Sequence, residues 1–342
     1  MSADEVPPAE IPIEQAVQRV LEAANEMQGS DVPPAFRDVL NAFVRHPDHE
    51  AGRLQIAERI RYVSAPCGAG FLSVWLGGGV EQGLDPEPAI PHLIAALLRW
   101  SRTLTLPDPD QEEDSADETP LDEATLSGLS WLGQGLVAHL ARSPEARARY
   151  GQNEEVLTEL ERVESVSNGC LWVGEVLRKR SGRLLVLHVE GAKGVRVTYE
   201  NLSNGFHLFT LLQGVLAGRM PGAGRVSEEA VAIARGERDG DASDSAWWHY
   251  GPGTVPEANF VASIWGEASP DQIPVIDGEQ VILLWPMQIG SRSWTGSFFT
   301  PRIEAAPARV TVVEELTPEE FETWRAKLKL PHPSPRPWWK FW

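Results

Sequence analysis

The chain has 342 residues, of which 42% are hydrophobic and 23% charged, with 13 Trp but only 2 Cys. This composition predicts a globular protein of about two domains and excludes disordered, collagen-like and disulfide-stapled classes. No run reaches the roughly 18 apolar residues of a membrane span, and the acidic start lacks the apolar core of a secretory signal, so we expect a cytoplasmic protein. Cys67 and Cys170 are far apart, as expected of free thiols.

The net charge of -19 is unevenly distributed, because residues 107–123 carry nine acidic side chains and no basic one. The segment 107–120 has no large apolar residue, and we interpret it as a flexible acidic loop. It is either a solvated insertion between helices or a strip that mimics nucleic acid or docks a basic partner. Direct nucleic-acid binding is not expected, because phosphate contacts need a basic face.

The first half of the chain has helical periodicity. Apolar residues recur on one face along 13–24, 36–44 and 54–60, and further helices are predicted at 121–141 and 153–165. The segments 70–80 and 86–104 are apolar all round, so we expect them to form the central buried pair. Residues 1–165 therefore predict a helical domain, either a bundle or a short α-solenoid.

The pattern changes near residue 171. A hairpin is predicted over 183–199, followed by a helix that Asn204 caps and that lies across the hairpin. Short strands are predicted at 246–250, 259–265, 273–276, 280–285, 293–299 and 309–314. Thr317 opens a last helix with a capping box. Residues 171–330 thus predict an α+β domain with a mostly antiparallel sheet.

Three pieces of sequence carry a resemblance. Gly70-Phe-Leu followed by Val80-Glu-Gln-Gly83, the stretch 204–212, and Ile273-Pro-Val-Ile-Asp-Gly278 resemble uncharacterised bacterial proteins with a helical N-terminal half. The resemblance covers residues 60–315. It implies a helical front half, and it transfers no catalytic residue to this chain.

No strong catalytic motif is present. The phosphate-binding glycine motifs and the nucleophile elbow are missing. Cys67 at a predicted helix start is either an activated thiolate or, as we favour, a small buried residue. His46 and His49 form the one candidate metal cluster, which we interpret instead as part of a helix cap. We therefore expect no catalytic residue, no metal and no cofactor.

Tryptophan is the compositional outlier, since ten of the 13 lie at or after Trp172. One interpretation places Trp265, Trp285, Trp294 and Trp324 in the core of the sheet domain. The other makes a second set of aromatic residues line a ligand or peptide groove: Trp247, Trp248, His249 and Tyr250.

The last twelve residues, 331–342, predict an extended proline-rich tail that ends in an aromatic cluster. Its candidate binding residues are Trp338, Trp339, Phe341 and Trp342. Three uses remain open: docking on the protein's own body, insertion into a groove on a protein partner, and weak contact with a membrane surface.

Together these features predict a non-enzymatic interaction or assembly module in the cytoplasm that binds a protein partner through the tail and a Trp-rich surface. The alternative is an enzyme or small-molecule-binding protein with a pocket in the α+β domain. A deep pocket in which two or more of His188, His207, His249, Glu267 and Asp271 converge would favour that alternative.

Overall fold

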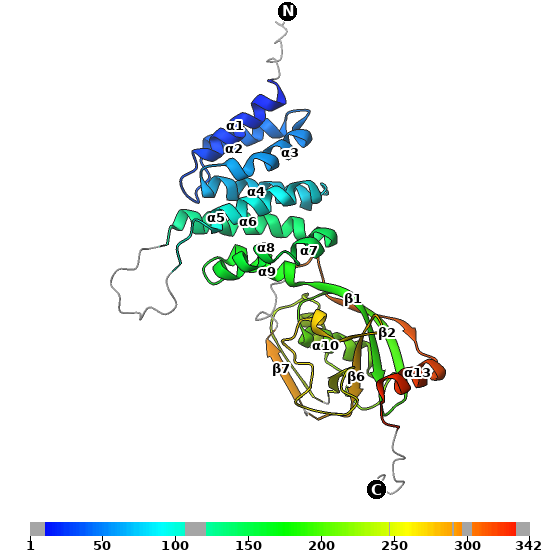
Figure 1. Ribbon diagram of the computed structural model, residues 1–342. Helices are drawn as coiled ribbons and strands as arrows, with labels where there is room; N and C mark the ends of the chain where they lie inside the picture. Colours follow the sequence, from blue (N-terminus) through cyan, green and yellow to red (C-terminus); the bar gives the residue numbers. More distant parts are fainter. Residues whose placement is uncertain (1–10, 107–120, 246, 289–290, 296–302, 333–342) are drawn as a thin grey trace, which may run out of the picture. The chain divides into compact units, whose positions relative to one another are not determined.

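The computed structural model describes residues 11–106, 121–245, 247–288, 291–295 and 303–332 (Figure 1). The chain divides into two units, Met1–Leu177 and Arg178–Trp342. The first is helical and the second contains sheets with helices, which confirms the predicted α+β class. The acidic segment 107–120 and the aromatic residues of the tail lie outside the described residues.

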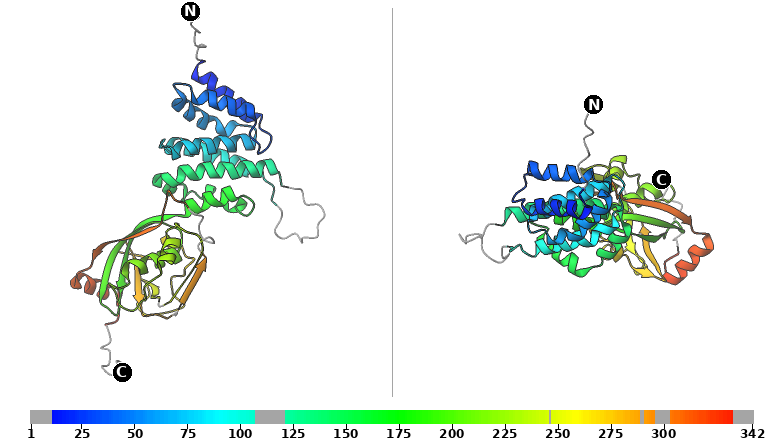
Figure 2. Two further views of the ribbon diagram at one scale, coloured as in Figure 1. Left: turned by 180° about the vertical axis from the view of Figure 1, so that it is seen from behind. Right: turned by 90° about the horizontal axis from the view of Figure 1, so that it is seen from above.

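The helices of the first unit stack in chain order (Figure 1, Figure 2). Helix α1 packs on α2 to α4, α4 packs on α6, and α6 packs on α7, so the layers follow one another. This order is that of a short α-solenoid. The helices are α1 (Ile13–Asn25), α2 (Pro34–Val44), α3 (His49–Arg59), α4 (Pro66–Glu81), α5 (Ile90–Ser101), α6 (Glu123–Arg142), α7 (Pro144–Tyr150), α8 (Glu154–Val163) and α9 (Asn168–Arg178), with short 3-10 turns at Ile60–Tyr62 and Glu87–Ala89.

Helices α4 and α5 are both rich in buried residues, as predicted, but the closest helix contact of the first unit is between α4 and α6. Glycines make the difference, because a Cβ at Gly70 or Gly77 of α4 would crowd the backbone of α6 at Gly128 or Gly135. The missing side chains bring the two helix axes close together. Ser73 closes the contact by donating from its hydroxyl to Leu132 O at 3.0 Å.

Helix α9 lies beyond the predicted end of the helical domain at residue 165. Its sequence holds two glycines and two valines, which weakens the helical signal. Gly169 packs backbone to backbone against Gly133 of α6, so tertiary contact stabilises a segment of poor helix propensity. The first unit therefore ends at Leu177, and β1 begins at Arg180, immediately after α9.

The second unit is built on a mixed sheet with the order β4-β6-β1-β2-β8, and β5 pairs with β6. The β1–β6 pair is parallel and the other pairs are antiparallel. Strands β3 and β7 form a separate antiparallel pair. The strands are β1 (Arg180–His188), β2 (Lys193–Leu202), β3 (Asp241–Ser245), β4 (His249–Pro252), β5 (Val275–Ile276), β6 (Glu279–Trp285), β7 (Ser291–Thr295) and β8 (Arg309–Glu315).

Each face of the large sheet has its own core. Helices α10 (Gly205–Leu216) and α11 (Glu228–Ala234) cover one face, where Phe209 and Leu212 meet Val186 and Val197. Helix α13 (Pro318–Leu328) covers the other face through apolar side chains that include Phe321. The predicted position of the first helix across the β1–β2 hairpin is confirmed.

The caps that were predicted for these helices are also confirmed. Asn204 Oδ1 accepts from His207 N–H at 2.9 Å, and Thr317 and Glu320 form the reciprocal capping box of α13. The strand predicted at 259–265 was wrong, because this segment is irregular apart from a short turn. Strand β3 lies in a polar stretch for which no strand was predicted.

Candidate functional site

The four aromatic residues predicted to line a groove lie in the core of the second unit. Trp247, Trp248, His249 and Tyr250 are each at most 2% exposed. The hydroxyl of Tyr250 donates to Phe209 O at 3.1 Å, and the two rings stack with their centroids 4.0 Å apart. These residues therefore position β4 against α10, and their role in binding stays a prediction.

Trp248 and His188 share a single acceptor. Trp248 Nε1 and His188 Nε2 each donate to Pro221 O at 2.8 Å, and Gly191 N–H donates to His188 Nδ1 at 2.8 Å. His188 is thus held as the neutral ring, and burial lowers its pKa. The two hydrogen bonds to Pro221 O stabilise the turn at Pro221–Gly222, where Gly222 has a φ of 89°.

The histidines and acids proposed as a catalytic set do not converge. His188 contacts Pro221, whereas the ring of His207 packs against Trp294 with centroids 4.9 Å apart. Asp271 forms an ion pair with Arg180 at 2.9 Å. These three groups have different partners, and none of the five proposed residues lines either of the two cavities described below.

The candidate metal cluster is a local hydrogen-bond motif. His46 Nδ1 accepts from Asp48 N–H at 3.0 Å, and His49 Nδ1 donates to His46 O at 2.9 Å. Among the described residues, no group of three or more His, Cys, Asp or Glu side chains is placed to hold a metal ion.

The two cysteines are buried and reduced. Burial raises the pKa of Cys67, whose thiol donates to Ala124 O at 3.2 Å. Burial also raises the pKa of Cys170 to about 11. Both groups are therefore neutral thiols near pH 7, which agrees with a packing role for Cys67.

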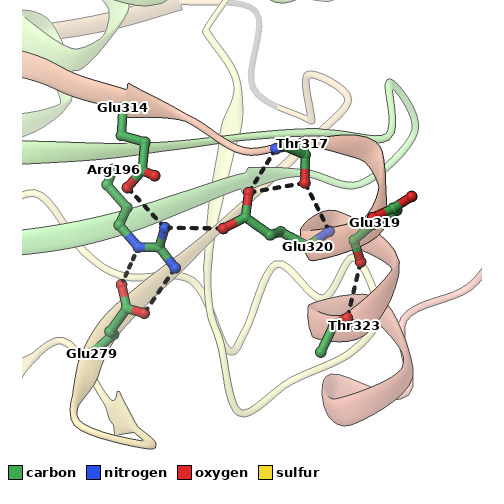
Figure 3. A network of polar contacts seen from close by, with 7 residues as sticks. All are labelled: Arg196, Glu279, Glu314, Thr317, Glu319, Glu320 and Thr323. Atoms are coloured by element: carbon green, nitrogen blue, oxygen red, sulfur yellow. Dashed lines mark hydrogen bonds and ion pairs between the residues drawn. The ribbon is translucent and has the colours of Figure 1, made fainter.

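One conspicuous polar cluster in the second unit surrounds Arg196 of β2 (Figure 3). Its guanidinium bonds Glu279 of β6 at 2.8 Å and Glu314 of β8 at 2.9 Å, and lies 3.8 Å from Glu320 of α13. Glu320 also accepts a hydrogen bond from Thr317 N–H at 2.8 Å, and this backbone bond is the main cause of the lowered pKa of Glu320. The cluster joins three strands to the start of α13, so we interpret it as structural.

Exposed apolar side chains gather in a segment that sequence reasoning had assigned to a strand. We call residues 257–267, which follow β4, the aromatic loop. Phe260 is 44% exposed, Val261 84% and Trp265 52%. The rings of Phe260 and Trp265 meet edge to face with centroids 5.7 Å apart. The expectation that Trp265 fills the core was wrong, whereas Trp285, Trp294 and Trp324 are buried as expected.

The aromatic loop is fixed by backbone hydrogen bonds at its return to the core. Ile264 N–H donates to Tyr250 O at 2.9 Å, and Phe206 N–H donates to Gly266 O at 2.8 Å. Gly266 has no room for a side chain, because a Cβ there would overlap the Phe206 ring. The exposed Trp265 therefore stands directly between two anchored backbone positions, and its orientation is defined before any partner binds.

A second surface feature is a groove beside α10, α11 and β8. Two adjoining cavities, of about 360 and 660 Å³, share Gly214, Val231, Arg235 and Glu237 in their walls. Apolar residues such as Leu211 and Val226 share the lining with charged residues, among them Arg225, Glu228 and Arg309. These volumes are in the range of small-molecule pockets.

A search of family models, of curated proteins and of solved structures returned no match to this chain. In the part of the chain that the structure describes, no helix is long and apolar enough to cross a membrane.

Proposed function

We propose that this protein is a non-catalytic interaction or assembly module, and that the aromatic loop binds a protein partner. The observation that carries the proposal is the exposed Phe260–Trp265 pair on a loop whose backbone is anchored. Tryptophan and other aromatic residues dominate the energetic centres of protein interfaces, because they bury much area with few rotatable bonds. The tail residues Trp338, Trp339, Phe341 and Trp342 remain the second proposed contact.

The chemistry around the loop favours a protein over an anionic membrane surface. Between residues 239 and 291 the sequence has no Lys or Arg, and Glu257 and Glu267 are exposed within the loop. Anionic headgroups would meet these carboxylates unfavourably. A partner with an apolar patch and flanking basic groups complements them.

A photo-crosslinking experiment tests the proposal. A benzoylphenylalanine placed at Val261 of the full chain is expected to crosslink a defined partner in the native cell. Trp265→Ala should reduce the yield at least tenfold, because loss of an interface tryptophan commonly costs about 2 kcal/mol or more. The control places the crosslinker at Val275, which is also exposed. Equal yields from both positions, or an unchanged yield with Trp265→Ala, would refute the proposal.

The second candidate function is small-molecule binding in the groove beside α10, α11 and β8. Its support is the pair of adjoining cavities, in which Gly214 lies between the two. Gly214→Leu would fill the shared wall. If the groove binds a metabolite, metabolites retained by the purified wild-type chain should be missing from this variant when both are analysed by mass spectrometry.

A further inference from the structure

We infer that the aromatic loop is occupied by the proline-rich segment 331–337 of the same molecule. This inference rests on the proposed function, because the segment covers the same loop in the free protein and competes there with the protein partner. The segment reads Pro-His-Pro-Ser-Pro-Arg-Pro and directly follows Leu330, at the end of the α13 region.

The loop has the surface chemistry that recognises proline-rich chains. Such chains adopt the polyproline helix without internal hydrogen bonds, and they dock their rings against exposed aromatic side chains. The edge-to-face arrangement of Phe260 and Trp265 presents one ring face beside another ring's edge. Because proline fixes the φ angle of its own residue and the loop backbone is already anchored, docking of a proline-rich segment loses little conformational entropy.

Charge complementarity favours this segment. Residues 331–342 contain Arg336 and Lys340 and no acidic residue. The loop offers Glu257 and Glu267, both exposed, and no basic side chain. A proline-rich segment with an arginine therefore matches the loop in both its apolar and its charged parts.

The C-terminal end of α13 lies at the end of the sheet where β6 begins. Lys327 forms an ion pair with Asp277, which lies in the turn between β5 and β6. Gly253 N–H donates to Val281 O at 3.0 Å, so the chain that leads into the aromatic loop leaves β4 beside the start of β6. The turn before β6 thus adjoins both the end of α13 and the approach to the loop.

The reach of the tail suits this geometry. Leu330 is buried in the core beneath α13, which gives the segment a fixed origin. Seven residues of polyproline helix extend roughly 22 Å at about 3.1 Å per residue. Phe206 N–H donates to Gly266 O, so the loop lies on the α10 face of the sheet, whereas Leu330 lies on the α13 face. The segment therefore passes around β4, the edge strand next to β6.

Fluorine NMR on the full chain tests the inference. The chain is labelled with 5-fluorotryptophan, and the Trp265 resonance is assigned by its loss in Trp265→Phe. Two tail variants are compared with the wild type: Arg336→Glu with Lys340→Glu, and Pro333→Ala with Pro335→Ala and Pro337→Ala. We expect both to move the Trp265 resonance in the same direction, towards its solvent-exposed position.

Titration with a synthetic peptide of residues 331–342 completes the test. The peptide should return the Trp265 resonance of the tail variants towards its wild-type position. A control peptide with alanine at the four prolines should bind at least tenfold more weakly. These shifts should not depend on protein concentration.

Three results would overturn the inference. The first is a Trp265 resonance that the tail variants leave unchanged, and the second is equal binding of the two peptides. The third is a shift that depends on protein concentration, together with dimerisation in light scattering, which would assign the loop to a second copy. Crosslinking of another protein at Val261 with undiminished yield in the tail variants, together with an unchanged Trp265 resonance, would remove only the inference. An unchanged crosslinking yield with Trp265→Ala would remove the proposed function itself.

Discussion

His207 is a titratable side chain that folding stabilises in its uncharged form. It is buried beside Trp294, and desolvation lowers its pKa to about 3. Since the ordinary pKa of histidine is about 6.5, the folded state resists protonation below that value. Stability from this source is fully present above about pH 6.5 and is lost as the pH falls towards 3.

We expect protonation of His207 in the unfolded chain to lower the free energy of unfolding of the second unit by about 2 kcal/mol between pH 7 and pH 5, at about 1.4 kcal/mol per pH unit below 6.5. His207→Gln should remove this contribution and leave the part of the slope that comes from His188, whose pKa burial also lowers. Urea denaturation followed by tryptophan fluorescence at both pH values measures it. The control His332→Gln alters an exposed ring and should retain the wild-type slope. A slope unchanged in His207→Gln would show that other groups govern it.

The tryptophans show what sequence reveals at the level of single residues. Trp285, Trp294 and Trp324 were expected in the core and are there. Trp265 could not be separated from them, because its run of apolar neighbours resembles a strand. Its exposure depends on which backbone groups receive hydrogen bonds, namely Tyr250 O and Gly266 O, and these contacts come from distant elements.

Glycine spacing, rather than apolar content, fixes the contact between α4 and α6. A Cβ at Gly135 would overlap the carbonyl of Ser73, whereas a Cβ at Gly78 on the same pair of helices would meet nothing within 4 Å. Gly135 and Gly78 therefore form a matched pair for substitution by alanine. We expect this substitution to change the free energy of unfolding in opposite directions at the two positions.

Gly135→Ala should lower the free energy of unfolding of the first unit by about 1 to 3 kcal/mol, because the overlap forces the helices apart. Gly78→Ala should raise it by about 0.5 to 1 kcal/mol, because alanine is the better helix former. Circular dichroism at 222 nm during thermal denaturation measures both. Destabilisation of similar size in the two variants would contradict the close contact at Gly135.

Elements with strong local signals were predictable, and elements that need a partner were not. The β1–β2 hairpin, the Asn204 cap and the Thr317 capping box follow from local patterns. The sequence of strand β3 does not alternate between apolar and polar residues. Segment β3 is a strand because its backbone pairs with β7. Helix α9 similarly depends on the close approach of Gly169 to α6.

At the scale of the whole molecule, each unit has its own buried core. Leu136 is fully buried in the helical unit, and Leu284 is fully buried in the sheet of the second unit. The boundary at Leu177 and Arg178 falls at the C-terminal end of α9, just before β1. We therefore expect each unit to unfold as a cooperative unit of its own.

Leu136→Ala and Leu284→Ala test this independence, since each should cost about 2 to 5 kcal/mol in the unit that contains it. Hydrogen exchange followed by mass spectrometry reports the two units separately. Leu284→Ala should accelerate exchange in β1, β2, β6 and α10 and leave α4 and α6 at their wild-type rates. Leu136→Ala should do the reverse. Acceleration in both units by either substitution would show that the helical and α+β units share one unfolding transition, and the interaction surface could then not be varied independently of the solenoid.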